Sequence, residues 1–185
     1  MIETPIEIPL SKKKMTLSFL GALAFVVIGL WFIVKPPYIS NPLLGNPIVL
    51  FIIGLASVIF FGIIAIINIR KFFDKRAGLI IDKDGIWDNS SGVSAGLVAW
   101  SDIRQIKVTQ IMSQRFIILI VDNPQTYIER VKNPLKRKTM DFNYKSYGSP
   151  ISISANSLNT NFDKLYNLLM EKKRESKSTH STNKH

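Results

Sequence analysis

Three aspartates lie close together in the stretch LIIDKDGIWDN. Asp82, Asp84 and Asp88 could supply oxygen ligands for a calcium ion, or paired carboxylates for acid–base catalysis. An EF-hand loop that began at Asp82 would need glycine at its sixth position and a bidentate carboxylate at its twelfth. The glycine instead arrives early, as Gly85, and the twelfth position is Val93. The spacing therefore excludes an EF-hand.

A β-hairpin explains the same aspartates better. Two short apolar runs, GLIID and GIWDN, flank a D-G pair, which is typical of a tight turn between antiparallel strands. Carboxylates beside an exposed turn lack the burial that moves their pKa toward neutrality. We interpret the three aspartates as turn formers and exposed strand neighbours, and we expect no metal and no cofactor.

Other reactive side chains are scarce. The 185-residue chain contains no cysteine, which excludes thiolate catalysis, disulfides and cysteine metal sites. Its two histidines, His180 and His185, lie in a polar C-terminal stretch, where a folded zinc or acid–base site is not expected. We predict a protein that is not an enzyme, with no catalytic residues.

The residues from Arg130 to Lys145 form a basic stretch interleaved with aromatic side chains, RVKNPLKRKTMDFNYK. Its densest cations are Lys136, Arg137 and Lys138. Three interpretations stay open: a solvated loop, a surface for anionic lipid headgroups, and a contact with protein or nucleic acid. A nearby membrane would favour the lipid over nucleic acid.

Two uncharged apolar segments, residues 15–34 and 48–69, precede this region. Each is long enough as a helix to cross the ~30 Å hydrocarbon core of a bilayer. The first apolar run is longer than that of a signal peptide, and a second follows closely, so we expect a retained anchor. The prediction is a transmembrane helical hairpin over residues 15–69.

The cations beside these segments predict their orientation. Those before the first segment are Lys12, Lys13 and Lys14, and those after the second are Arg70, Lys71, Lys75 and Arg76. The loop between the segments carries only Lys35. The positive-inside rule then places both termini in the cytoplasm, in a multi-pass protein of the inner membrane. The cluster after the second segment is also a candidate contact for lipid or a protein partner.

Residues 78–173 read as a cytosolic domain. Short apolar runs separated by turn residues predict an antiparallel sheet or open barrel. A helical period follows, and we expect a helix over about 160–173 with Thr160 and Asp163 in a capping box. The flanks are predicted as a cytosolic N-terminal segment, 1–14, and a disordered tail, 174–185.

The sequence GLIIDKDGIWDN, followed by GLVAWSDIRQIKV, resembles the strand, D-G turn, strand and W-x-D-I pattern of bacterial pleckstrin-homology-like (PH-like) domains. That resemblance implies that the chain turns after the third strand, with Trp100 and Ile103 facing the core. With the IEIPLSKKK start and the two apolar segments, the layout resembles a family of small bacterial membrane proteins with two N-terminal spans and a cytosolic PH-like domain. The resemblance carries no catalytic residues.

The sequence thus predicts an α+β membrane protein: a two-helix transmembrane hairpin, then a small antiparallel PH-like sheet or barrel with a C-terminal capping helix. Its expected function is a membrane-anchored, non-catalytic binding or regulatory module, which presents the domain at the inner leaflet to a lipid or membrane-protein partner. The alternative is an immunity or stress-type membrane protein that acts through its hairpin. The sequence leaves the oligomeric state open.

Overall fold

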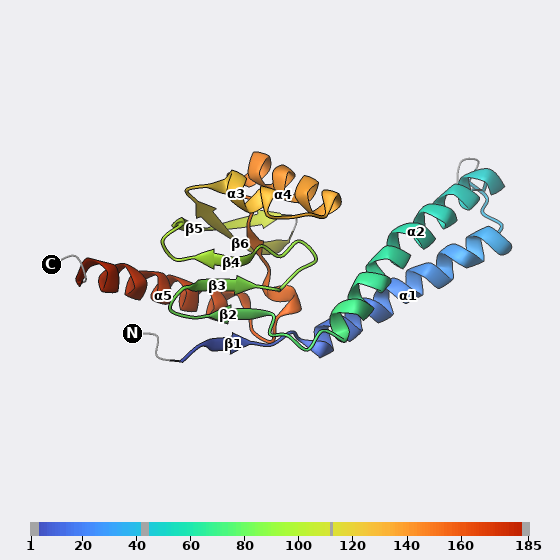
Figure 1. Ribbon diagram of the computed structural model, residues 1–185. Helices are drawn as coiled ribbons and strands as arrows, with labels where there is room; N and C mark the ends of the chain where they lie inside the picture. The colour runs from blue at the N-terminus through green and yellow to red at the C-terminus, as the bar shows by residue number, and fades with distance from the viewer. Residues whose placement is uncertain (1–3, 42–44, 112, 183–185) are drawn as a thin grey trace. The chain divides into compact units, whose positions relative to one another are not determined.

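The computed structural model describes residues 4–41, 45–111 and 113–182. The chain divides into two compact units: a helical pair, Lys12–Lys75, and an α/β unit formed by Met1–Ser11 with Arg76–His185. Figure 1 shows the elements of both units. The predicted mixture of two long apolar helices near the N-terminus with an antiparallel β domain is confirmed.

The helical pair consists of α1 (Lys12–Val34) and α2 (Pro47–Phe72), which contain the two predicted apolar segments. Both are long and apolar enough to cross a membrane. The start of α2 suits its residues. The Asn46 side chain accepts a hydrogen bond from the Ile48 amide (2.9 Å), and Pro47 occupies the first turn, where no amide donor is needed.

The two helices run antiparallel and come closest at two glycines. A Cβ added to Gly29 would lie 2.8 Å from the Gly54 carbonyl oxygen, and one added to Gly54 would lie 2.6 Å from the Gly29 oxygen. Nearby, the rings of Phe25 and Phe61 stack with centroids 4.3 Å apart. The Ser57 hydroxyl donates to the Phe25 carbonyl oxygen (3.0 Å). One glycine from each helix thus allows the close approach that membrane helices often use.

The α/β unit holds two antiparallel sheets and several helices. The first sheet has the order β1 (Ile6–Ile8), β2 (Leu79–Ile81), β3 (Gly85–Asp88), β4 (Gly96–Ala99). The second has the order β5 (Ile103–Ile111), β6 (Gln114–Val121), β7 (Ser152–Ile153). The helices are α3 (Pro124–Glu129), α4 (Pro134–Tyr147), the 3-10 turn η1 (Ala155–Ser157) and α5 (Phe162–Thr182).

The N-terminal segment belongs to the first sheet. Strand β1 pairs with β2, with Ile8 opposite Leu79 and Ile6 opposite Ile81. Ile8 and Leu79 are both buried in the core. The predicted boundary at residue 78 therefore misses a strand that precedes the helical pair in the chain.

Trp100 and Ile103 lie in the core, as the PH-like resemblance implies. The chain turns between β4 and β5 at Trp100, and the Trp100 indole N–H donates to the Asp82 carbonyl oxygen (2.8 Å). This bond ties the turn to the D-G hairpin. The same core includes residues of both sheets and Leu165 and Leu169 of α5.

Three predictions for the C-terminal half need correction. The basic stretch, expected as a loop, forms helix α4. Helix α5 continues to Thr182, past its predicted end at residue 173 and into the tail expected to be disordered; residues 183–185 lie outside the described part. At the start of α5, Asn161 rather than Thr160 is the cap, because its side chain accepts from the Lys164 amide (2.9 Å).

Candidate functional site

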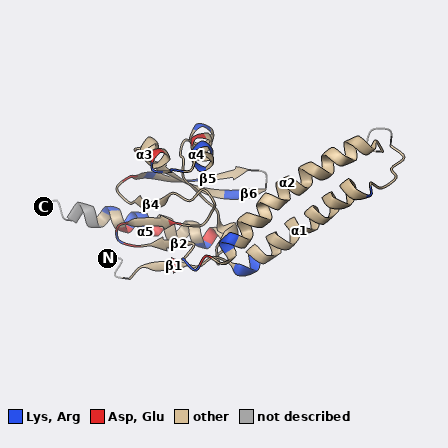
Figure 2. Cartoon of the chain, turned by 45° about the vertical axis from the view of Figure 1, so that its right-hand side comes forward, with Lys and Arg blue, Asp and Glu red and all other residues tan. Residues whose placement is uncertain are grey.

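Basic residues gather at one end of the helical pair. Helix α1 begins with Lys12, Lys13 and Lys14, and α2 ends with Arg70 and Lys71, so the antiparallel packing brings the two groups to the same end. Figure 2 shows this concentration of Lys and Arg where α1 begins and α2 ends. Of these cations, Lys71 has a carboxylate within ion-pair distance, Asp74 at 3.9 Å. The other predicted cations of this cluster, Lys75 and Arg76, follow α2 and are exposed.

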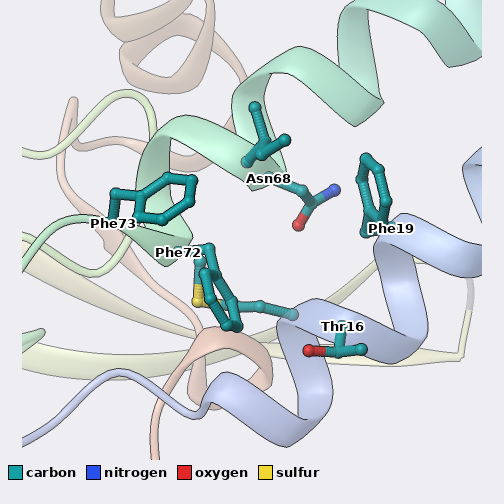
Figure 3. A pocket seen from close by; sticks show the side chains of 7 residues that line it. Thr16, Phe19, Asn68, Phe72 and Phe73 are labelled. Atoms are coloured by element: carbon teal, nitrogen blue, oxygen red, sulfur yellow. The ribbon is translucent and has the colours of Figure 1, made fainter.

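An apolar pocket of about 250 Å³ lies between α1 and α2 at this end. Figure 3 shows the seven side chains that line it: Met15, Thr16, Phe19, Asn68, Ile69, Phe72 and Phe73. The Lys12 ammonium lies 5.5 Å from the centroid of the Phe72 ring, beside the pocket wall. The pocket suits an apolar chain whose polar end carries negative charge. Sequence reasoning missed it because it depends on how the two helices pair.

Asn68 is the main polar side chain of this pocket. Its amide nitrogen donates to the Ser18 hydroxyl oxygen (3.3 Å) and to the Ile64 carbonyl oxygen (3.0 Å). The first bond links α2 to α1, and the second returns to the preceding turn of α2. Asn68 therefore fixes one wall of the pocket.

Helix α4 carries the predicted basic stretch. The Asn133 side chain caps it by accepting from the Leu135 amide (3.0 Å) and the Lys136 amide (3.1 Å). Its C-cap is Gly148, whose φ of 78° lies in the left-handed region that glycine adopts without strain. Only Met140 of this helix is buried in the core.

The structure separates the three predicted cations of α4. Successive helical residues are rotated by about 100°, so neighbours in sequence cannot share one face. Lys136 is half-buried, and Arg137 turns back to donate to the Val131 carbonyl oxygen (3.2 Å). Lys138 is exposed. The run KRK therefore spreads over several sides of α4.

The aspartates of the opening stretch have two different roles. The Asp82 side chain accepts from the Asp84 amide (2.9 Å) and the Gly85 amide (3.0 Å), which confirms it as a turn former. Asp88 was expected to be exposed, and this is wrong: it is 4% exposed. Its carboxylate accepts from the Ser90 amide (2.9 Å) and the Ala95 amide (3.1 Å). Among the side chains that the structure describes, in residues 4–41, 45–111 and 113–178, no group of three or more His, Cys, Asp or Glu could hold a metal.

A second polar pair lies between the β4–β5 turn and α3. The Tyr127 hydroxyl donates to the Asp102 carboxylate (2.7 Å), and the Arg130 guanidinium lies 4.5 Å from the centroid of the Tyr127 ring. Burial and, next, the bond to Asp102 raise the pKa of Tyr127 to about 12. Tyr127 is therefore a neutral hydrogen-bond donor at physiological pH. Sequence reasoning missed this pair because it did not predict α3.

Lys173 of α5 joins the same turn. Its ammonium donates to the Trp100 carbonyl oxygen (2.7 Å). Burial lowers the pKa of Lys173, the Lys177 charge lowers it further, and Asp122 opposes both. Together with the Tyr127–Asp102 bond, this contact holds the turn Trp100–Ile103 against α3 and α5.

Comparisons with protein-family models, with curated proteins and with solved structures found no match for this chain. Function is therefore inferred from its own residues. Two described surfaces have chemistry suited to a bilayer: the basic end of the helical pair with its apolar pocket, and the exposed side of α4.

Proposed function

We propose that this protein is a membrane-anchored, non-catalytic binding or regulatory module whose α/β unit works at the inner leaflet of the cytoplasmic membrane. The pairing of β1 with β2 carries this proposal. Strand β1 precedes α1 and β2 follows α2, yet the two are neighbours in one sheet. If both helices cross a membrane, the start of α1 and the end of α2 must then lie on the same side of it.

The exposure of the two helices supports membrane insertion. In each helix, only 11% of the most apolar 18-residue stretch is buried within the structure. Large apolar side chains such as Leu17 (73% exposed) and Ile48 (69% exposed) are mostly uncovered by protein. Apolar area in water costs roughly 25 cal/mol per Å², and lipid removes that cost. A helical pair of this kind is stable in a bilayer and poorly soluble outside one.

The charge distribution supports a cytoplasmic location for both termini. The basic residues of the helical pair concentrate where α1 begins and α2 ends, whereas Lys35 is the charged residue that follows α1 at the other end. Cytoplasmic flanks of membrane helices carry this excess of Lys and Arg. The α/β unit would then face the anionic inner leaflet.

The interior of the α/β unit supports a binding role without catalysis. Two antiparallel sheets followed by α5, with Trp100 inside, agree with the PH-like layout that the sequence resembles. The buried Asp88 carboxylate is used by neighbouring amides, and Tyr127 stays protonated. Each serves the stability of a turn or loop and is poorly suited to act as a base.

Topology provides the test of this proposal. A reporter that is active only in the cytoplasm is fused after His185, and the same reporter is inserted in the loop between α1 and α2. We expect activity from the first fusion and none from the second, with the chain retained in membranes after alkaline carbonate washing. Release by carbonate, or activity of the loop fusion, would overturn the proposal.

The pocket between α1 and α2 favours a second candidate, an immunity or stress-type protein that acts through its hairpin. A photoreactive side chain at Thr16, inside the pocket, is compared with one at Leu17, which is 73% exposed. Crosslinks from position 16 to one membrane protein, lost when Phe19→Trp fills the pocket, support this candidate. Crosslinks to lipid alone at both positions reject it.

A further inference from the structure

One side of α4 is apolar and exposed. Leu135 is 75% exposed and Phe142 is 60% exposed. They stand seven residues apart in the sequence, which is about two helical turns, so they follow each other along one line of the helix. The helix buries Met140 in the core on another side. The line of Leu135 and Phe142 is therefore not part of the core.

Two exposed lysines accompany this apolar line. Lys138 lies three residues after Leu135, and Lys145 lies three residues after Phe142, so each neighbours an apolar side chain on the helix surface. Lys145 donates to the Asp141 carboxylate (2.6 Å), but the side chains are 71% and 42% exposed. An exposed ion pair of this kind is weak and readily exchanged for another anion. We call Leu135, Lys138, Phe142 and Lys145 the α4 outer face.

We propose that the α4 outer face docks onto an anionic bilayer, with Leu135 and Phe142 among the lipid chains and Lys138 and Lys145 at the phosphates. An apolar line bordered by cations is typical of helices that lie in the membrane interface. Lysines also hold their ammonium groups at the headgroups while their stems cover apolar surface. The inference deepens the proposed function and rests on the membrane anchoring that it assumes.

The tether favours a bilayer as the occupant of this face. Residues 73–78 join α2 directly to β2, so anchored helices would keep the α/β unit within a short reach of the headgroups. Such a tether makes docking intramolecular, and even a small interface is then occupied. The α4 outer face also has the charge complementary to anionic lipid. These cations differ from the predicted set, because Lys136 is half-buried and Arg137 bonds to Val131.

The absence of cysteine in the sequence allows one introduced cysteine to report on one position. The full chain with Phe142→Cys, carrying an environment-sensitive fluorophore, is placed in phosphatidylcholine nanodiscs with and without phosphatidylglycerol. Val108→Cys is the matched control, because Val108 is exposed (44%) on β5. We expect a blue shift and quenching by spin-labelled lipid at position 142 only with phosphatidylglycerol, reversed by high salt. Position 108 should remain in water.

Removal of charge gives a second readout. Lys138→Ala with Lys145→Ala should reduce the quenching of a fluorophore at position 142 several-fold. Lys107→Ala with Lys164→Ala removes the same charge from exposed positions elsewhere and should leave the quenching unchanged. Circular dichroism checks that both double variants are folded.

A water-exposed position 142 in both nanodiscs would overturn the inference. Burial that is equal in both lipids and survives high salt would overturn it as well, because the burial would then not depend on anionic headgroups. Neither result affects the proposed function if the chain stays in the membrane with both termini on one side. Loss of the chain from the membrane would instead overturn the proposed function.

Discussion

Ile8 and Leu79 face each other in adjacent antiparallel strands, although the whole helical pair separates them in the chain. The Gly78 amide continues the pairing by donating to the Ile8 carbonyl oxygen (2.9 Å). Gly78 is closely enclosed, since a Cβ there would collide with a methyl carbon of Leu158. The segments before and after the helical pair are therefore built into one sheet.

Ile8→Ala should destabilise the α/β unit by roughly 2–4 kcal/mol, because it removes buried methyl groups and leaves a cavity beside Leu79. Glu7→Ala changes an exposed residue of the same strand and should stay within about 0.5 kcal/mol. Urea unfolding of the full chain in detergent, followed by circular dichroism, measures both. If Ile8→Ala had an effect as small as that of Glu7→Ala, the Ile8 side chain in β1 would add no stability.

Gly29→Ala and Gly54→Ala should loosen the helical pair, because each new Cβ would meet the backbone of the other helix below 3.0 Å. Gly21→Ala and Gly62→Ala are the controls, since no atom lies within 4 Å of their added Cβ. The controls should be neutral or stabilising by up to about 1 kcal/mol, as alanine favours a helix over glycine. The midpoint of thermal unfolding in detergent distinguishes the two crossing variants from the two controls. Controls that destabilise as much as the crossing variants would contradict the packing.

Local patterns predicted much of this fold. The apolar segments gave both long helices, and the D-G pair placed the β2–β3 turn, where Asp82 accepts two amides. The W-x-D-I pattern placed Trp100 and Ile103 in the core. In each case the residues that determine the structure are neighbours in the sequence.

Structure that depends on distant partners was missed. Strand β1 is three residues long, and its partner lies beyond the helical pair, so no local period marks it. The pocket beside Lys12 exists only when α1 and α2 pack together. Asp88 looks like an exposed strand residue in the sequence, and it is buried because the loop to Ala95 folds back over it. The amphipathic helix α4 was not predicted, because the charged run KRK spreads over several of its faces and obscures the apolar period.

The Tyr127–Asp102 pair predicts a pH dependence of stability. Folding raises the pKa of Tyr127 from 10.0 to about 12, so the folded state favours the protonated phenol. This contribution is complete below pH 10 and is lost as the pH rises through about 12. Tyr127→Phe should be less stable than the natural chain below pH 10, and the difference should shrink above it. Urea unfolding over this range, with Tyr144→Phe as an exposed control, measures the effect. A constant difference would contradict the bond.

Asp88 should matter for stability in a way that Asp84 does not. Asp88→Ala leaves the Ser90 and Ala95 amides without their acceptor, at a cost of roughly 1–3 kcal/mol. Asp84 is exposed, and Asp84→Ala should stay within about 0.5 kcal/mol.

The response to calcium distinguishes a structural role of Asp88 in its loop from a metal site in the same stretch. The Asp88 oxygens already accept backbone amides, so neither calcium nor a chelator should change the midpoint of unfolding of the natural chain. Thermal unfolding in calcium and in chelator measures this directly. A midpoint that rises with calcium, and no longer does so in Asp88→Ala, would show that the carboxylate binds metal instead of holding the loop.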